Sequence, residues 1–236
     1  MTANTDSRPV GSKVDPLPAG IMPDGRPLFG RYVMLEHVSS AKHALDLYES
    51  FRQSDPEGDL WTYMGYGPFD DFDQFRAWLE GRETSTDPLF YAYVPKHSGK
   101  ASGMGSFMRF DASNGVIEIG HIWLSKRLQR SREATESIYL MMRHAFEDLG
   151  VRRLEWKCDA LNAASRRAAD RFGFTFEGVF RQHYIVKGRN RDTAWYSVVD
   201  KEWKSLRQAF DKWLDVTNFD AAGKQRARLR AALKGS

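Results

Sequence analysis

The segment from 116 to 158 constrains the fold more than any other part of the chain. Its pattern predicts a strand (116–124), an amphipathic helix (131–149) and a second strand (151–158). A helix that joins two strands of one sheet forms a right-handed crossover, so these two strands should be parallel. Other strand signals lie at 31–38, 88–94, 104–110, 174–187 and 192–199, and most are linked by turns. We therefore predict an α/β (α+β) architecture with a mixed, mostly antiparallel sheet and one parallel strand pair.

The length and composition suit one domain with extensions. Residues 1–27 hold five prolines and predict an extended arm, 28–200 a compact domain, and 201–236 a C-terminal helix with a basic tail. The hydrophobic share of 42% excludes global disorder. No uncharged apolar run approaches the ~18–20 residues that cross a bilayer, so we expect no membrane partner. With no apolar stretch of signal-peptide type at its start and with one cysteine, Cys158, the chain is expected in the cytoplasm.

The charge of the chain says little about its partners. A formal charge of +4 is too small to indicate nucleic-acid binding without a localised patch, although it is compatible with an anionic cofactor. The predicted helix near 201–214 could cover a sheet edge or the face of a homodimer. A solvated basic tail is favoured over an amphipathic helix that binds nucleic acid. The tail residues at issue are Lys224, Arg226, Arg228, Leu229, Arg230, Leu233 and Lys234.

The passage from the strand at 116–124 into the helix beginning near Ser131 could bind phosphate. The first backbone N–H groups of a helix have no partner within it, and with the helix dipole they attract anions. Lys126, Arg127, Arg130 and Arg132 add four positive charges to this short span. An alternative is a solvated basic loop that only caps the helix. A second candidate end is the helix near 162–172, which Asn162 can cap, with Ser165 close by.

Taken together, these stretches resemble the GNAT superfamily of acyl-CoA-dependent N-acyltransferases. The resemblance runs from about Arg31 to Val199, and within the superfamily it favours the Rim-type branch of ribosomal-protein N-terminal acetyltransferases. It is carried by Glu118-Ile-Gly120, Trp123-Leu124, Gln129 to Ala134, Asn162, Ser165, Gly173-Phe174, and the early Leu60-Trp-Thr-Tyr63 and Gly67-Pro-Phe69.

The resemblance implies a cofactor, a fold detail and a set of binding residues. The central parallel strands should be splayed to admit the pantetheine arm of acetyl-CoA, with helices on both faces of the sheet. The reaction implied is acetyl transfer to a primary amine, with no metal. The residues expected to bind the cofactor are Ile122, Trp123, Leu124, Gln129, Arg130, Ser131, Arg132, Glu133, Ala134, Asn162 and Ser165.

One position departs from the family pattern. The loop usually reads Gln/Arg-x-x-Gly-x-Gly/Ala, whereas this chain has Gln129-Arg-Ser-Arg-Glu-Ala134, so Arg132 replaces the middle glycine. Glycine there lets the backbone approach the pyrophosphate closely. Arg132 could instead add a charge-assisted contact to phosphate, or it could weaken binding; we expect binding to be retained. Glu133 argues mildly against binding unless its side chain points away.

Glu118 is the candidate general base. An amine is mostly protonated at neutral pH, so a base must take its proton before it can attack a thioester. The alternative is that Glu118 only pairs with an arginine such as Arg109. His121 is a second, weaker candidate. By resemblance, backbone N–H groups near 122–124 should bind the thioester oxygen, and Ser165 or Tyr184 should protonate the leaving thiolate. Cys158 is expected to be a buried apolar residue and not a nucleophile.

The acceptor should bind on the side of the sheet away from the phosphates. The two early helices, the loop 61–69 and a basic hairpin around Arg181, His183, Lys187 and Arg189 could build its site. Alternatively, the aromatic residues of the loop are core, and the hairpin is a solvated edge strand whose charges prevent aggregation. The acceptor could be a protein N-terminus, an aminoacyl group or a small amine. Two alternatives remain: the same enzyme using succinyl-CoA or another acyl donor, and a catalytically silent CoA-binding or interaction module.

Overall fold

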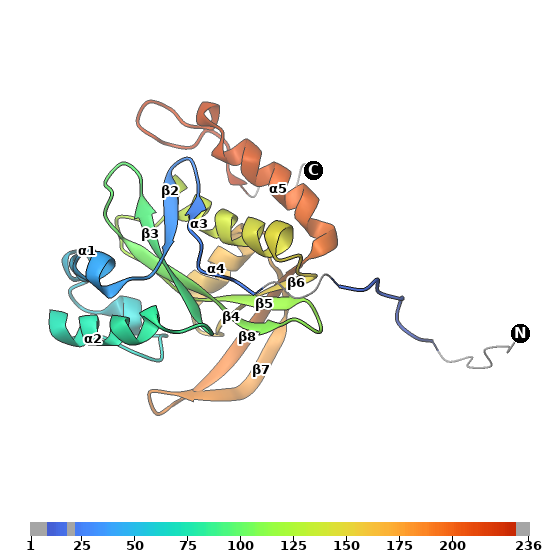
Figure 1. Ribbon diagram of the computed structural model, residues 1–236, viewed down its shortest axis with the longest axis horizontal. Helices are drawn as coiled ribbons and strands as arrows, with labels where there is room; N and C mark the ends of the chain where they lie inside the picture. Colours follow the sequence, from blue (N-terminus) through green and yellow to red (C-terminus); the bar gives the residue numbers. More distant parts are fainter. Residues whose placement is uncertain (1–8, 18–21, 230–236) are drawn as a thin grey trace, which may run out of the picture.

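The computed structural model describes residues 9–17 and 22–229. These residues form one eight-stranded sheet in the order β1-β2-β3-β4-β5-β6-β8-β7 (Figure 1). All neighbours are antiparallel except β5 and β6, which confirms the mixed sheet with one parallel pair. The strands are β1 (Leu28–Phe29), β2 (Val33–His37), β3 (Leu89–Pro95), β4 (Gly103–Asp111), β5 (Val116–Leu124), β6 (Arg153–Asp159), β7 (Thr175–Val186) and β8 (Arg189–Val199).

Helices cover both faces of the sheet (Figure 1). One face carries α1 (Ser40–Ser54) and α2 (Phe72–Glu83); the other carries α3 (Arg132–Arg143), α4 (Ala163–Arg171) and, outside α3, α5 (Asp200–Leu214). Local sequence explains the helix ends. Asp71 caps α2 by accepting from the Gln74 amide, and Ser131 caps α3 in the same way from Ala134. Short turns complete the set: η1 (Asp59–Trp61), η2 (His144–Asp148) and η3 (Val216–Asn218).

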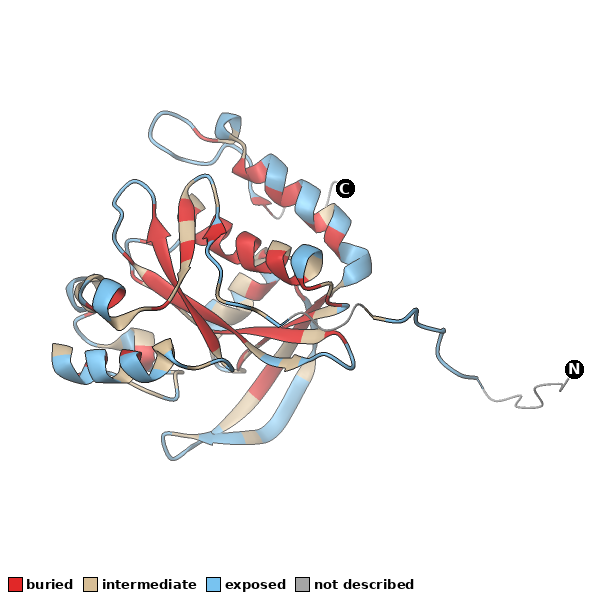
Figure 2. Ribbon diagram, viewed as in Figure 1, coloured by how far each residue is buried: buried red, intermediate tan, exposed pale blue. Residues whose placement is uncertain are grey.

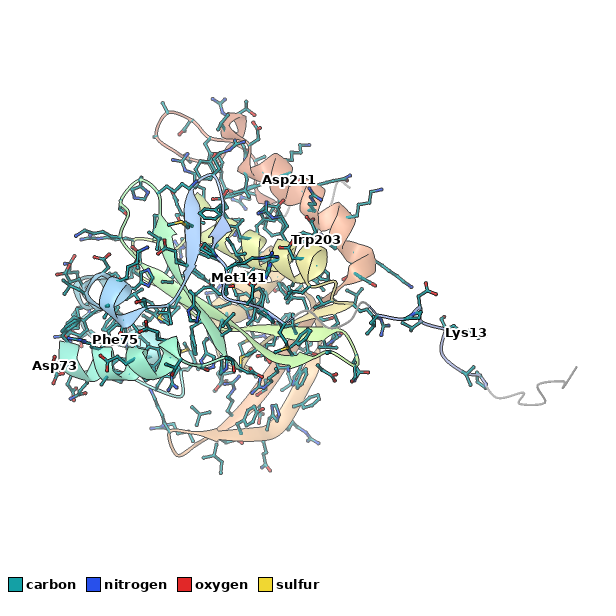
Figure 3. All side chains as sticks on the ribbon, viewed as in Figure 1. Lys13, Asp73, Phe75, Met141, Trp203 and Asp211 are labelled. Atoms are coloured by element: carbon teal, nitrogen blue, oxygen red, sulfur yellow. The ribbon has the colours of Figure 1, made fainter. Side chains whose placement is uncertain are left out.

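The sheet separates two hydrophobic clusters, because successive side chains of a strand point to opposite faces. On β3, Tyr91 and Tyr93 pack towards α3, whereas Phe90 and Ala92 pack towards α1 and α2. Figure 2 shows the buried residues concentrated in the central strands and in α3. Met141 of α3 lies in the middle of the molecule and accepts a hydrogen bond from the Tyr93 hydroxyl (3.1 Å; Figure 3).

Helix α5 packs on α3 and shares its hydrophobic cluster. Trp203 stacks on Phe146, and Phe210 stacks on Tyr139 of α3 (Figure 3 labels Trp203). The Tyr139 hydroxyl also donates to Asp211 of α5. The apolar face of this helix is therefore used within the chain and covers a helix, where the sequence had left open a sheet edge or a dimer face.

Several boundaries differ from the sequence-based ones. The short strand β1 was not predicted, and the expected helix 131–149 ends as α3 at Arg143 and continues as a π-helical turn, η2. Residues 9–17 carry no helix or strand and extend away from the body (Figure 1). In the tail, Phe219 bridges to Gln225, so 219–228 is not the amphipathic helix weighed above. Arg230, Leu233 and Lys234 lie outside the described residues. No described helix is long and apolar enough to cross a bilayer.

Candidate active site

The parallel strands β5 and β6 pair over only part of their length. Their ladder joins Val116, Ile117 and Glu118 to the stretch 153–155, although β5 continues to Leu124 and β6 to Asp159. Beyond Glu118 the two strands diverge. From there to Leu124, the backbone N–H and C=O groups of β5 that point towards β6 form no ladder hydrogen bonds with it. Those groups could hydrogen-bond an extended chain such as pantetheine lying between the strands. This agrees with the splay that the family resemblance implied.

A β-bulge lies on β5 where the strands diverge. Trp123 is opposite Met104 and Gly120 is opposite Ser106, so His121 and Ile122 together face a single residue, Gly105. His121 has a φ of 51°, which is uncommon for a residue with a Cβ. Gly105 is required here, because a Cβ at that position would lie 1.9 Å from the Tyr93 hydroxyl. Bulges of this kind re-aim side chains and recur beside active sites.

The loop between β5 and α3 presents free backbone donors. The Ser131 hydroxyl accepts from the Ala134 amide (3.0 Å) and donates to the Leu128 carbonyl (2.7 Å), which fixes the start of the helix. The amides of Arg130, Arg132 and Glu133 donate to no described residue. The positive φ of this loop falls on Arg130 (61°). Three free amides at the positive end of a helix are suited to a diphosphate.

Three of the four basic side chains of the loop are already engaged. Lys126 pairs with Asp55 (3.3 Å), and Arg127 donates to Gln53 (3.1 Å), so both are bound to α1 or the residue after it. The guanidinium of Arg132 lies 4.5 Å from the ring of Tyr32. Arg130 is exposed and forms no ion pair with a described residue. The expectation of four available charges is therefore corrected: Arg130 alone remains for a phosphate.

Arg132 does not occupy the mouth of the loop. It is the first residue of α3, so it needs no positive φ, and its guanidinium lies against the rings of Tyr32 and Phe219 (4.5 and 5.6 Å from their centres). Glu133 is buried and lies 3.7 Å from His97 and 3.5 Å from Arg132. These contacts account for both side chains without a phosphate.

The other residues expected at the cofactor serve local structure as well. Asn162 caps α4 by accepting from the Ser165 amide (3.0 Å), and the Ser165 hydroxyl accepts from the Trp156 indole (2.9 Å). Gln129 donates to the Leu124 carbonyl (3.0 Å). The Trp123 side chain belongs to the core under α1 and α2, whereas Ile122 and Leu124 pack on the opposite cluster. Residues 122–124 could thus contact a cofactor only through their backbone or their partly buried aliphatic groups.

Glu118 is buried, and two cations hold one of its oxygens. Oε2 accepts from Arg109 (2.7 Å) and from Lys157 (3.0 Å), while 3% of the residue is exposed. Oε1 has no partner among the described residues and lies 3.6 Å from where a Cβ at Gly120 would be. Lys157 is shared with Glu155 (2.6 Å). The arginine pairing weighed in the sequence analysis is present, and it leaves the second oxygen of Glu118 free.

Arg109 reaches Glu118 because of a second bulge. It has a φ of 53°, the register of β4 against β5 shifts between Met108 and Asp111, and the Arg109 amide donates to Asp87 (2.9 Å). The same guanidinium donates to the Tyr184 hydroxyl (3.3 Å). Tyr184 therefore lies beside Glu118, whereas Ser165 lies behind β6 with α4. The two candidate acids are on opposite faces of the sheet.

His121 is held by aromatic neighbours. Its ring stacks on Tyr66 (centroids 5.6 Å apart), and Nδ1 lies 3.3 Å from the Tyr66 hydroxyl. Burial, and then the positive charges of Arg82, Arg109 and Arg191, lower the pKa of His121 to about 4. The imidazole is consequently neutral and weakly basic at neutral pH. Glu118, whose second oxygen has no partner among the described residues, stays the candidate for the base.

A third bulge brings the β7–β8 hairpin over this face of the sheet. Three residues of β7, 181–183, oppose Asp192 alone, and Gln182 has a φ of 50°. At the tip of the hairpin, Lys187 donates to the Trp61 carbonyl (2.9 Å) of η1. The hairpin and the loop after α1 thus meet. We call the surface that carries Glu118, His121, Lys157, Tyr184 and Trp195 the α1–α2 face.

Sequence reasoning missed two members of this group. Lys157, buried beside Glu118, was read only as part of a strand, and Trp195 was not singled out. The sequence carried no signal for Lys157, because charged and apolar residues alternate along β6, a pattern that is also typical of a strand with one face in solvent.

Comparison with known proteins gives a consistent result. Residues 33–175 match the model of the acetyltransferase (GNAT) domain. A GCN5-related N-acetyltransferase from Brucella melitensis is 44% identical, with a TM-score of 0.88 over 93% of this chain and 97% of that one. A GNAT-family protein from Chromobacterium violaceum is 37% identical, with a TM-score of 0.75 over 84% of this chain and all of that one.

A curated relative is more distant. The Bacillus subtilis protein YdaF, provisionally named a ribosomal N-acetyltransferase, is 31% identical over 108 residues. That match covers 46% of this chain and only 58% of the length of YdaF.

Proposed function

Because this chain belongs to the GNAT family of acetyltransferases, we propose that it moves an acetyl group from acetyl-CoA to a primary amine. The observation that supports this most is the entrance to α3. Three free amides, the helix dipole and Arg130 converge there, next to the point where β5 and β6 diverge. The direction of Arg132, away from the loop, supports retained cofactor binding and weakens the case for a silent module.

The residues of this chain divide into a donor side and an acceptor side. Bound acetyl-CoA would supply an activated thioester; the amides of 130–133 and Arg130 would hold its diphosphate, and the unpaired edge of β5 its pantetheine. Asn162 has an amide nitrogen left to donate. On the other side, Glu118 Oε1 would take a proton from the attacking amine, directly or through water. Arg109 and Lys157 fix the orientation of that carboxylate.

The leaving sulfur needs a proton to become free CoA. Tyr184 is the better placed of the two candidates, because its hydroxyl shares Arg109 with Glu118 on the α1–α2 face. Ser165 is used by Trp156 and lies behind β6. In this scheme the C–S bond breaks as the C–N bond forms, Glu118 receives the amine proton, and Tyr184 gives one to sulfur.

The acceptor is proposed only by class. Relatives such as YdaF point to a protein N-terminus of the kind found on ribosomal proteins, and small amines remain open. Binding of acetyl-CoA to the folded chain should raise its melting temperature, and thiol release should require an added amine. If no melting shift occurs, cofactor binding and the proposed activity both fail. If succinyl-CoA raises the melting temperature more than acetyl-CoA does, succinyl-CoA would be assigned as the acyl donor instead.

Glu118→Gln tests the base. It keeps the shape of the side chain but removes its charge, so we expect thiol release to fall about 100-fold or more while the acetyl-CoA melting shift persists. Glu177→Gln is the matched control, because Glu177 on β7 is a partly exposed carboxylate that pairs with Arg153 of β6 and does not contact Glu118. Near-normal rates of Glu118→Gln at every pH would remove Glu118 from the mechanism.

A further inference from the structure

Four buried polar atoms without a hydrogen-bond partner cluster on the β7–β8 hairpin. They are His183 Nδ1, Arg191 Nε, Thr193 Oγ1 and Trp195 Nε1. Three of them belong to alternate residues of β8, so they point to the same face of the sheet. Thr193 is fully buried. An unsatisfied buried donor costs roughly 1–3 kcal/mol. Several in one row therefore call for a ligand that completes them.

This row adjoins Glu118 on the α1–α2 face. The Lys157 ammonium, which binds Glu118, lies 3.9 Å from the centre of the Trp195 ring. The Arg191 guanidinium lies 5.7 Å from the ring of Tyr184, whose hydroxyl accepts from Arg109. Trp195, at one end of the row, thus contacts Lys157, which binds Glu118. Arg191, at the other end, contacts Tyr184, which is linked to Glu118 through Arg109.

The chemistry of the row selects an oxygen ligand. The indole N–H of Trp195 and the Nε–H of Arg191 can only donate, while the Thr193 hydroxyl can donate or accept. Arg191 forms no ion pair with a described residue. Burial lowers the pKa of His183, the charges of Arg191, Arg109 and Lys157 lower it further, and the charge of Glu118 raises it. Arg109 and Lys157 are already paired with Glu118, so Arg191 supplies the uncompensated positive charge of the row. That charge, together with the donors, favours an anion over a neutral carbonyl.

We propose that the acceptor is an amine that also carries a carboxylate, and that Arg191, Thr193 and Trp195 bind this carboxylate while the amine faces Glu118. The proposal rests on the proposed acetyl transfer and specifies its substrate class. The carboxylate could be the α-carboxylate of a free amino acid or an acidic side chain near a peptide N-terminus. Both offer the same chemistry to the row.

Matched acceptors test the proposal in the full chain. l-Alanine is compared with l-alaninamide, and the amidated tripeptide Ala-Glu-Ala with Ala-Gln-Ala, by thiol release at saturating acetyl-CoA. We expect at least one acidic member to show a kcat/KM about tenfold or more above its neutral partner. The pair that discriminates identifies the source of the carboxylate. Equal or better use of both neutral members would overturn the proposal while leaving acetyl transfer intact.

Two variants connect the preference to the row. Thr193→Val removes a hydroxyl donor with little change in shape, and Trp195→Phe removes the indole N–H together with part of the ring. Both should abolish the preference, mainly through a higher KM for the acidic member of each pair. Thr175→Val, at the exposed start of β7, is the control and should retain the preference. A preference that survives both row variants would place the carboxylate elsewhere and refute the assignment.

A readout independent of turnover covers the case in which none of these amines is acetylated. The indole N–H resonance of Trp195 is assigned by its loss in Trp195→Phe and followed by ¹⁵N NMR with CoA present. It should shift on adding an acidic member and not its neutral partner. A resonance that ignores all four compounds would mean that water satisfies the row, and the proposal would fall even if acetyl-CoA binds.

Discussion

Arg132 illustrates how a residue with a long side chain can stand where the family pattern has glycine. Its backbone takes ordinary helical geometry, and its guanidinium packs against the rings of Tyr32 and Phe219. Arg130, the neighbour with a positive φ, keeps a free charge. The local sequence predicted the helix start and its cap, because capping depends on adjacent residues. It could not predict where the Arg132 guanidinium lies, since Tyr32 and Phe219 are distant in the chain.

Restoring the family glycine should affect stability more than binding. Arg132→Gly removes the cation–π contacts and adds backbone freedom, so we expect the free energy of unfolding to fall by about 1 kcal/mol. The dissociation constant for acetyl-CoA, measured by calorimetry, should stay the same. Arg130→Gln is the contrasting variant and should weaken binding by about tenfold. A large gain in affinity for Arg132→Gly would show that the guanidinium obstructs the loop.

His121 should make the protein sensitive to mild acid. Its folded pKa of about 4 lies below the ordinary 6.5, so the unfolded chain takes up the proton first as pH falls. The contribution of His121 to the free energy of unfolding is fully present above pH 6.5. It is lost progressively as the pH falls towards 4, by about 3 kcal/mol. Urea unfolding of the wild type and of His121→Asn at pH 7.5 and 4.5 checks this. The variant should lose less stability between the two pH values than the wild type does.

At the scale of elements, three bulges shape the α1–α2 face. Arg109 in β4, His121 in β5 and Gln182 in β7 each have φ near 50°. The bulges bring Arg109, His121 and the hairpin side chains to one region around Glu118. The strands themselves could be predicted from alternation and turn residues. The bulges could not, because a positive φ at Arg, His or Gln is imposed by pairing with neighbouring strands and has no local signature.

Two glycine substitutions should shift stability in opposite directions. Gly105→Ala places a Cβ against the buried Tyr93 hydroxyl, opposite the β5 bulge, and should cost about 1–3 kcal/mol. Gly81→Ala lies inside α2 with nothing within 4 Å of the new Cβ, so it should stabilise the protein by about 0.5–1 kcal/mol. Denaturant unfolding of both variants tests the comparison. A tolerated Gly105→Ala would mean that the bulge can relax.

At the scale of the molecule, the two faces of the sheet carry different groups of residues. The entrance to α3 and the start of α4 form the proposed cofactor side, while the α1–α2 face brings together Glu118, Tyr184 and the hairpin. Helix α5 packs on the face that carries α3, where it stacks on Tyr139 and on Phe172. The amphipathic pattern predicted the helix α5. It could not predict that α5 packs on α3, because an apolar stripe does not indicate which surface it packs against.

Phe210→Ala should show that α5 is part of the same cooperative unit as α3. Phe210 is fully buried, so its truncation should lower the free energy of unfolding by about 3–5 kcal/mol in a single transition. Leu45→Ala on α1 removes a mostly exposed side chain and should change stability by less than about 0.5 kcal/mol. Two separate transitions would indicate that α5 folds apart from the rest.

The packing of Phe219 against Arg132 bears on how the protein can be handled in the laboratory. Leu229 is also buried, so the chain is still in contact with the body ten residues beyond Phe219. An affinity tag or fluorescent fusion at this end could disturb the contact of Phe219 with Arg132, which is the first residue of the helix proposed to bind the cofactor. Residues 9–16, the first that the structure describes, are exposed, which makes the N-terminal side the better place for a label.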